Sequence, residues 1–199
     1  SLPLKEEALN SENVLCLFIP NTYEMYWNTS AIVFFNRMKK EYDNFWTNAR
    51  RQKAHQQELT PVQVSILASI VQSETKQDAE KPRVAGVYLN RLRQSWKLEA
   101  DPTLVYAIGD FSIKRVLNEY KTIDSPYNTY KYFGLPPGPI CLPDISSIDA
   151  VLNAENHQFM YFCAREDMSG FHAFAKDYNT HLLNAKRYQA ELNRRNIKK

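Results

Sequence analysis

The feature that most restricts how this chain can fold is a long stretch, residues 62–73, without a single charged side chain. Thr60 and Pro61 stand directly before it, and these residue types are favoured at the cap and first turn of a helix. Apolar residues then recur at helical spacing, which predicts one helix from residue 61 to about residue 74. Because so few polar side chains lie along this helix, we expect it to be largely buried.

Other segments complete a predicted α+β fold in which helices dominate. Asp78 and Asp101 are expected to cap the helices that they begin. Residues 125–143 are rich in Pro, Gly and Asn, which predicts a long ordered loop. The pattern predicts further helices over residues 30–57, 78–96, 101–109, 146–153 and 180–199, and short strands over residues 14–19, 160–164 and 171–175.

Length, charge and cysteine usage exclude several classes of protein. A chain of 199 residues suits one sizeable domain with a core of its own. The net charge of +3 is too small for the basic surface that binds nucleic acid, so no such partner is expected. The 3 cysteines and 4 histidines follow no metal-ligand spacing, so no metal site is expected. Cys16 and Cys163 lie in apolar runs and are expected to be buried.

No stretch of the sequence reaches the length of a membrane-spanning helix, and no signal peptide begins it. The chain opens at Ser1 without an initiating Met, so we expect it to be a fragment of a longer protein. The missing span therefore does not argue against an anchor in the whole protein.

Glu74 is the residue that points most directly to chemistry. It ends the uncharged helix, on the same face as Ile70 and Val71. Burial disfavours the charged form of a carboxyl group, so we expect the pKa of Glu74 to be raised. A glutamic acid with a pKa near neutral can serve as a general acid. The alternative is that Glu74 points into solvent where the helix ends.

Nearby side chains leave other kinds of chemistry open. Glu99 or Asp101 would provide the second carboxylate that a hydrolase needs beside its acid. Cys141 and His172 form a conceivable nucleophile pair, although no local sequence signature accompanies them. The sequence contains no glycine-rich phosphate-binding loop.

Several segments resemble the YceG-like family of bacterial proteins, and together they cover nearly the whole chain in order. The similarity is clearest in LASIVQSET at residues 67–75, RVAGVYLNRL at 83–92 and LEADPT at 98–103. Further similar segments are LFIPNTYE at 17–24, YNTY at 127–130, GLPPGPI at 134–140, YF at 161–162 and HAF at 172–174. The chain departs from the family at Glu99 and Ala100, where Gln and a small polar residue are more usual, and at residues 141–144.

The resemblance implies a lysozyme-like catalytic domain within a protein that also has an N-terminal transmembrane helix and a small LysM-like part. On this basis residues 14–199 are expected to be the catalytic domain, with the active-site core at about 60–175. Residues 1–13 are expected to be a linker or a remnant of the LysM-like part. The resemblance also implies a whole protein at the periplasmic face of the bacterial inner membrane, with peptidoglycan synthases among its partners.

The activity implied by the resemblance is endolytic cleavage of peptidoglycan without water. The bond between N-acetylmuramic acid and N-acetylglucosamine breaks inside a glycan strand, and a 1,6-anhydromuramyl end remains. Glu74 matches the family's catalytic glutamate and would act first as acid and then as base. The resemblance implies no metal or organic cofactor.

Further residues are expected to bind the glycan. Asn90 would hydrogen-bond sugar or hold Glu74, unless it only joins two helices. His172 and Phe174 share one face of a strand, and we expect the first to line the cleft and the second to pack in the core. The polar-aromatic loop would bind N-acetyl groups and ring faces, or else only pin its own turn. The stiff run at 134–139 is expected to shape the cleft wall. The expected substrate-binding residues are Asn90, Asp101, Tyr127, Asn128, Thr129, Tyr130 and His172.

Two competing functions remain open at this point. A lysozyme-like muramidase would use water and would need Asp101 or Glu99 as its second carboxylate. A silent glycan-binding or scaffold module would need no acid at all, and the apolar setting of Glu74 argues against it.

Overall fold

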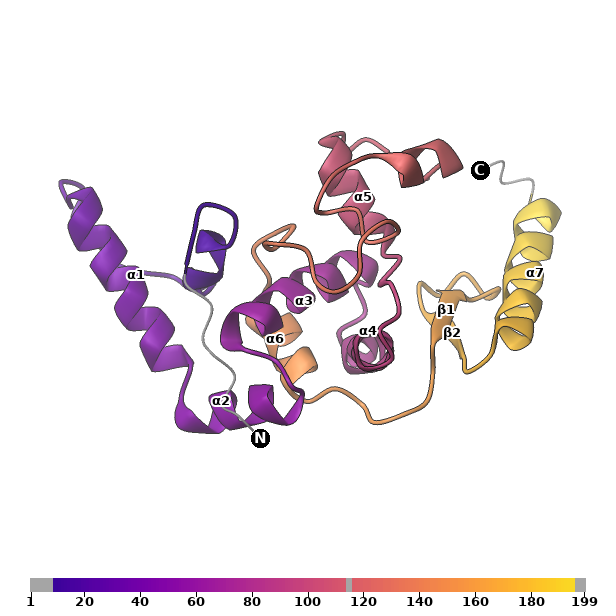
Figure 1. The fold of residues 1–199 in the computed structure, drawn as a ribbon, viewed down its shortest axis with the longest axis horizontal. Helices are drawn as coiled ribbons and strands as arrows, with labels where there is room; N and C mark the ends of the chain where they lie inside the picture. The colour runs from indigo at the N-terminus through magenta and orange to yellow at the C-terminus, as the bar shows by residue number, and fades with distance from the viewer. Residues whose placement is uncertain (1–8, 114–115, 196–199) are drawn as a thin grey trace.

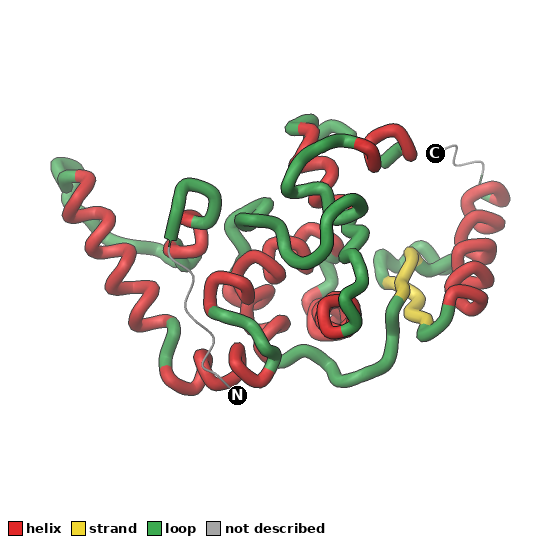
Figure 2. Tube along the Cα trace, in the orientation of Figure 1, coloured by secondary structure: helices red, strands yellow, loops and turns green. Residues whose placement is uncertain are grey.

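The structure, a computed structural model, describes residues 9–113 and 116–195 (Figure 1). Helices dominate these residues beside one two-stranded sheet (Figure 2), so the predicted α+β fold is confirmed. None of the described helices is both long and apolar enough to cross a membrane. The elements are η1 (Val14–Leu17), α1 (Ala31–Phe45), α2 (Asn48–Gln56), α3 (Pro61–Glu74), η2 (Asp78–Glu80), α4 (Lys81–Arg93), α5 (Asp101–Ile108), η3 (Asn118–Thr122), α6 (Ile145–Leu152), β1 (Tyr161–Ala164), β2 (His172–Ala175) and α7 (Tyr178–Arg194), where η denotes a 3-10 helix.

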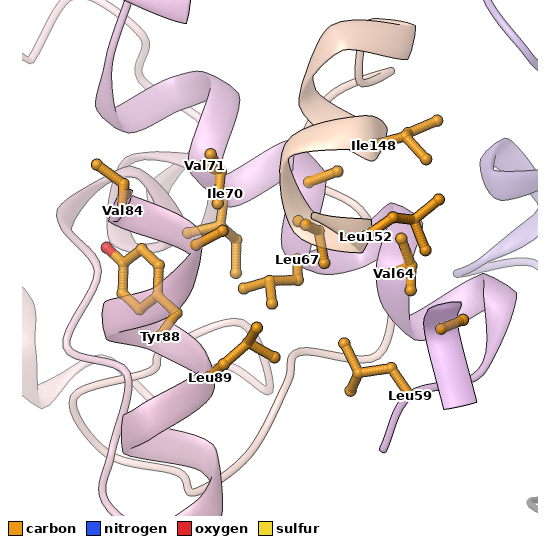
Figure 3. Close-up of a cluster of buried hydrophobic side chains, with 14 of the residues drawn as sticks. Leu59, Val64, Leu67, Ile70, Val71, Val84, Tyr88, Leu89, Ile148 and Leu152 are labelled. Carbon is orange, nitrogen blue, oxygen red and sulfur yellow. The ribbon is translucent and has the colours of Figure 1, made fainter. Parts of the chain in front are cut away.

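Helix α3 lies in the middle of the core, as its uncharged sequence predicted. The Thr60 side chain accepts a hydrogen bond from the backbone N–H of Gln63, and the Gln63 side chain accepts one from the backbone N–H of Thr60. This capping box satisfies amides that the first turn would leave unpaired. Helices α4 and α6 cover α3 (Figure 3). The shared core includes Val64, Leu67, Ile70 and Val71 of α3, Val84, Tyr88 and Leu89 of α4, and Ile148 and Leu152 of α6.

Strands β1 and β2 lie where the sequence predicted two short strands, and they pair as an antiparallel hairpin. Phe162 stands opposite Phe174, and both rings pack against the core, which confirms the prediction for Phe174. Helix α7 packs along both strands (Figure 1). The predicted end of this last helix, residues 196–199, lies outside the described residues.

The strand predicted at residues 14–19 was wrong, because this segment begins as the 3-10 turn η1. Cys16 is buried as expected, and it packs on α3 through Val62. A strand requires a neighbouring strand for its backbone hydrogen bonds, and the described sheet pairs only β1 with β2. Cys163, also predicted to be buried, is only partly so because it lies in β1 at the edge of the core.

The single helix predicted over residues 30–57 is divided into α1 and α2. The indole of Trp46 is buried in the core, and its backbone leaves the helical region with φ −82° and ψ 64°. The Thr47 side chain then accepts a hydrogen bond from the backbone N–H of Arg50 and caps α2. Apolar spacing runs up to Trp46 and a polar, helix-compatible stretch follows it, so the sequence pattern did not reveal the break.

Neither aspartate that was predicted to cap a helix does so. Asp78 lies inside η2, where its carboxylate pairs with Lys81 at 2.7 Å. Asp101 is the first residue of α5, and Ala100 occupies the N-cap position. The Asp101 side chain is therefore free for another partner.

Residues 125–143 form a long loop without helix or strand, as predicted. The loop crosses the N-terminal segment so closely that a Cβ atom at Gly138 would lie 1.9 Å from the backbone oxygen of Glu12. Only a glycine allows the two backbones to approach this far. The crossing fixes the loop against the body of the domain.

Candidate active site

A cleft of about 490 Å³ opens beside the C-terminal end of α3. Its lining combines a few polar side chains with a larger apolar set, as is usual for sites that bind small molecules. The end of α3 contributes Ser73 and Glu74; α5 contributes Asp101, Pro102, Val105 and Tyr106; the following loop contributes Phe111, Ile113 and Val116; and the loop before α6 contributes Ile140 and Cys141.

Glu74 is the last residue of α3 and is partly buried. The Tyr88 hydroxyl donates a hydrogen bond to Glu74 Oε1 at 2.5 Å. Burial raises the pKa of Glu74 to about 7, and the negative charge of Asp101 also raises it, whereas the hydrogen bond from Tyr88 and the charge of Arg91 lower it. The expected rise is confirmed. A carboxyl group with this pKa exists in both protonation states near neutral pH, so it can give up a proton and take one back.

Tyr88 of α4 is a site residue that the sequence did not single out. Its side chain is 1% exposed, and its ring packs edge-on against Phe162 with centroids 5.9 Å apart. A buried tyrosine hydroxyl needs a hydrogen-bond partner. This requirement was the only feature of the sequence that could have pointed to Tyr88. The partner could not be identified from the sequence, because it depends on how α4 lies across α3.

Asp101 shares the cleft with Glu74. The Tyr130 hydroxyl donates a hydrogen bond to Asp101 Oδ1 at 2.5 Å. Burial, and then the bond to Asp101, raise the pKa of Tyr130 above its ordinary value. The structure therefore brings Asp101 and Tyr130, both predicted to bind substrate, together at the cleft.

Asn128 and Thr129 lie beneath the surface, with 0% and 2% exposure. The Asn128 amide donates to the backbone oxygens of Lys121 and Ile123, and its Oδ1 accepts from the backbone N–H of Tyr130. Thr129 Oγ1 accepts from the backbone N–H of the residue before α5. The expected sugar contacts are not available to these buried side chains, which pin their own loop instead.

Tyr127 stands behind the cleft rather than in its lining. Its ring centroid lies 4.7 Å from that of Tyr106, which does line the cleft. Burial raises the pKa of Tyr127 to about 12. Its described contacts therefore support the cleft wall, and a direct contact with substrate stays a prediction.

Asn90 does not hold Glu74. Its side-chain amide donates to the backbone oxygens of His157 and Phe159, at 2.8 and 3.0 Å. These bonds tie α4 to the segment that leads into β1. The position beside Glu74 is taken by Tyr88 instead.

His172 lies away from the cleft lining and is held by Glu80, a residue that the sequence did not single out. Its ring Nδ1 lies 2.7 Å from Glu80 Oε2, and its backbone N–H donates to Glu80 Oε1 at 2.8 Å. Thr75, the residue after Glu74, donates its hydroxyl to Glu80 Oε2 at 3.3 Å. The buried Glu80 carboxylate thus joins β2 to the end of α3.

The remaining candidates do not assemble another site. The sulfur of Cys141 contacts Ser69 and Ser73 rather than a histidine, and burial raises the pKa of this thiol, which disfavours the reactive thiolate. Glu99 pairs with Arg91 at 3.9 Å. Among the described residues, no three His, Cys, Asp or Glu side chains gather as a metal site would require.

The Gly-Pro run was expected to shape the cleft wall, but it lies elsewhere. Residues 134–137 line a separate hollow of about 660 Å³, together with Leu59 and Leu89. This hollow is larger than the cleft but lacks Glu74. The part of the loop that reaches the cleft is Ile140 and Cys141.

The fold and the site together define a helix-dominated α+β domain built around one partly buried carboxylic acid at a cleft. The model of the YceG-like family matches residues 2–187, and the chain belongs to this family.

Three similar proteins with curated names or solved structures support this assignment. The endolytic murein transglycosylase of Bacillus subtilis (strain 168) is 37% identical over 127 residues, which cover 64% of this chain and 34% of the relative. That of Streptococcus pneumoniae serotype 2 (strain D39 / NCTC 7466) is 28% identical over 172 residues, 82% of this chain and 30% of the relative. The crystal structure of a yceG-like protein from Listeria monocytogenes aligns with a TM-score of 0.72 and 31% identity, and covers 84% of this chain and 54% of that one. The chain thus spans about a third of the length of these two curated relatives.

Proposed function

We propose that this chain is the catalytic domain of an endolytic peptidoglycan lytic transglycosylase. Its substrate would be the bond between N-acetylmuramic acid and N-acetylglucosamine inside a glycan strand, and its product a 1,6-anhydromuramyl end. The observation that carries the proposal is Glu74, a partly buried acid at a cleft with a pKa of about 7. The names of the two curated relatives support the same reaction.

In the proposed mechanism Glu74 acts twice. The protonated carboxyl gives its proton to the oxygen that links the two sugars, and the bond between this oxygen and C1 of the muramyl residue breaks. The C6 hydroxyl oxygen of the same muramyl residue then bonds to C1, and its proton passes to the Glu74 carboxylate. No water is consumed, and the carboxyl returns to its starting state.

A hydrolase would differ in needing a second carboxylate to activate water. Asp101 is the carboxylate that shares the cleft with Glu74, and Tyr130 donates to it. In the transglycosylase mechanism the Asp101 carboxylate has another use, because its negative charge stabilises the positive charge that develops on the sugar ring. The products distinguish the two reactions, because a hydrolase leaves a reducing end and a transglycosylase leaves a 1,6-anhydromuramyl end.

The test is digestion of purified peptidoglycan by the wild type and by Glu74→Gln, followed by mass spectrometry of the fragments. We expect internal fragments with anhydromuramyl ends from the wild type and none from the variant. Glu155→Gln is the matched control, because Glu155 is exposed and only pairs with Arg83 at 2.8 Å. Products heavier by one water would contradict the proposal and indicate a muramidase. Binding without any product would leave a glycan-binding module.

Action on peptidoglycan implies an extracytoplasmic place of work. We propose that the whole protein acts at the periplasmic face of the inner membrane, held by an anchor outside this sequence, beside peptidoglycan synthases. Protease protection of the full-length protein in spheroplasts tests its location. Cross-linking in growing cells, with synthases identified among the adducts, tests the partners, and a full-length protein protected inside the cell would contradict both.

A further inference from the structure

The buried Tyr88 hydroxyl forms its hydrogen bond with Glu74. Its oxygen lies 2.5 Å from Glu74 Oε1, and the tyrosine is buried to 1% exposure between α4 and the core. Within the described part of the chain, Glu74 is the hydrogen-bond partner of this hydroxyl. A phenol that accepted a proton from Glu74 would have to leave its own O–H unpaired, which is costly in a buried position. The hydroxyl therefore donates to Oε1 in both protonation states of Glu74.

We propose that Tyr88 is a positioning residue that determines which oxygen of Glu74 carries the catalytic proton. A protonated carboxyl group has one O–H donor and one accepting oxygen. Since Oε1 accepts from Tyr88, the proton would sit on Oε2, and Oε2 would be the oxygen that serves the cleft lined by Glu74. This inference rests on the proposed function, in which Glu74 is the acid.

Fixing the proton on one oxygen has a consequence for rate. Without the Tyr88 hydroxyl, the carboxyl group can rotate, and the proton is shared between an oxygen that reaches the substrate and one that does not. The reacting geometry is then populated for only part of the time. The loss should appear in kcat, because Tyr88 is buried and does not touch the substrate, so KM should change little.

The same hydrogen bond also affects the protonation of Glu74. The groups that act on Glu74 from the surrounding elements are Tyr88 and Arg91 of α4 and Asp101 of α5. Tyr130, from the loop that contacts α5, also interacts with the Glu74 charge. The bond from Tyr88 stabilises the carboxylate, so its removal should move the pKa of Glu74 upward from about 7.

Tyr88→Phe removes the hydroxyl and keeps the ring that packs on Phe162. Tyr23→Phe is the matched control, because the Tyr23 hydroxyl donates to the backbone oxygen of Ile19 at 2.6 Å, away from the cleft. For both variants we would measure kcat and KM for anhydromuramyl products against pH. We expect Tyr88→Phe to lower kcat about tenfold and to shift the alkaline limb to higher pH, with Tyr23→Phe unchanged.

A second readout does not depend on activity. NMR titration of carboxyl-labelled glutamate in the free protein, with the Glu74 signal identified by its loss in Glu74→Gln, gives the pKa directly. We expect a higher pKa in Tyr88→Phe than in the wild type. An active wild type whose pH profile and Glu74 pKa are unchanged in Tyr88→Phe would overturn the inference, even if the variant were less stable. A wild type without anhydromuramyl products would instead overturn the proposed function, while the titration would still decide whether Tyr88 holds Glu74.

Discussion

At the scale of single residues, the raised pKa of Glu74 makes the stability of the fold depend on pH. Between pH 4.5 and about 7 the folded chain keeps a proton that the unfolded chain releases, so a rising pH favours unfolding. This stabilisation is complete below pH 4.5 and is lost as the pH rises through about 7, with a total of roughly 3 kcal/mol. Glu74→Gln has no such proton, so we expect it to be more stable than the wild type near pH 8 but not near pH 4. Urea unfolding at both pH values measures this, and an equal difference at both would contradict it.

Gly138 supports a second prediction at this scale. A methyl group there would meet the backbone of Glu12, which cannot move as a flexible side chain can. We expect Gly138→Ala to lower the free energy of unfolding by about 1–3 kcal/mol. Gly134→Ala is the comparison, because that glycine has φ +83° but open space around it, and should cost only about 1 kcal/mol of strain. Thermal unfolding of both variants would show whether contact or backbone strain dominates.

The sequence allowed the burial and raised pKa of Glu74 to be predicted, because both follow from its place on an uncharged helix. Tyr88 and Glu80 could not be assigned in the same way. Glu80 and His172 are 92 positions apart in the chain, and only the packing of the hairpin beside α4 brings them into contact. For Asn128 the sequence suggested a functional role that the structure does not favour. Its polar side chain was expected to face the substrate, but it is buried and hydrogen-bonds the backbone of its own loop.

At the scale of elements, Glu80 couples the hairpin to the end of α3. Glu80→Ala would leave the His172 backbone N–H, the His172 ring and the Thr75 hydroxyl without their acceptor in a buried place. We expect a loss of about 2–4 kcal/mol, since each unpaired buried group costs about 1–3 kcal/mol. Glu155→Ala removes only an exposed ion pair with Arg83 and should cost less than about 1 kcal/mol. Denaturant unfolding compares the two, and similar losses would contradict the assigned coupling.

Helices with strong local signals were predicted well, and the failures share one physical cause. The start of α3 is determined by Thr60 and Gln63, which are neighbours in the sequence. In contrast, η1 forms because Cys16 packs on a helix 46 residues further along, at Val62. Trp46 ends α1 because its indole belongs to the common core. The pattern of neighbouring residues in the sequence does not show where such distant partners lie in the fold.

At the scale of the whole molecule, α1 extends away from the body that α3, α4 and α6 form (Figure 1). Met38 of α1 is buried to 3% exposure, whereas Ile32, on the same helix, is 65% exposed. We expect Met38→Ala to cost at least about 2 kcal/mol of stability, and Ile32→Ala less than about 0.5 kcal/mol. Thermal unfolding of the pair checks this, and equal losses would mean that α1 is covered along its length in solution.

The fold class and the family could both be predicted from the sequence, because residues 61–103 hold the central helix, Glu74 and the most similar motifs together. The complete lining of the cleft could not be predicted from the sequence. Its lining joins the end of α3 to Phe111, Ile140 and Cys141, which are far apart in the chain. Only the completed fold shows that Asp101 and Glu74 share one cavity.

The crossing of Gly138 over Glu12 also has a mechanical meaning. Two backbones in such close contact move together, so tension applied to the segment before η1 would be transmitted to the loop. Two residues beyond Gly138, the same loop reaches the cleft at Ile140 and Cys141. The contact between Gly138 and Glu12 therefore gives the beginning of the domain a mechanical connection to the wall of the cleft.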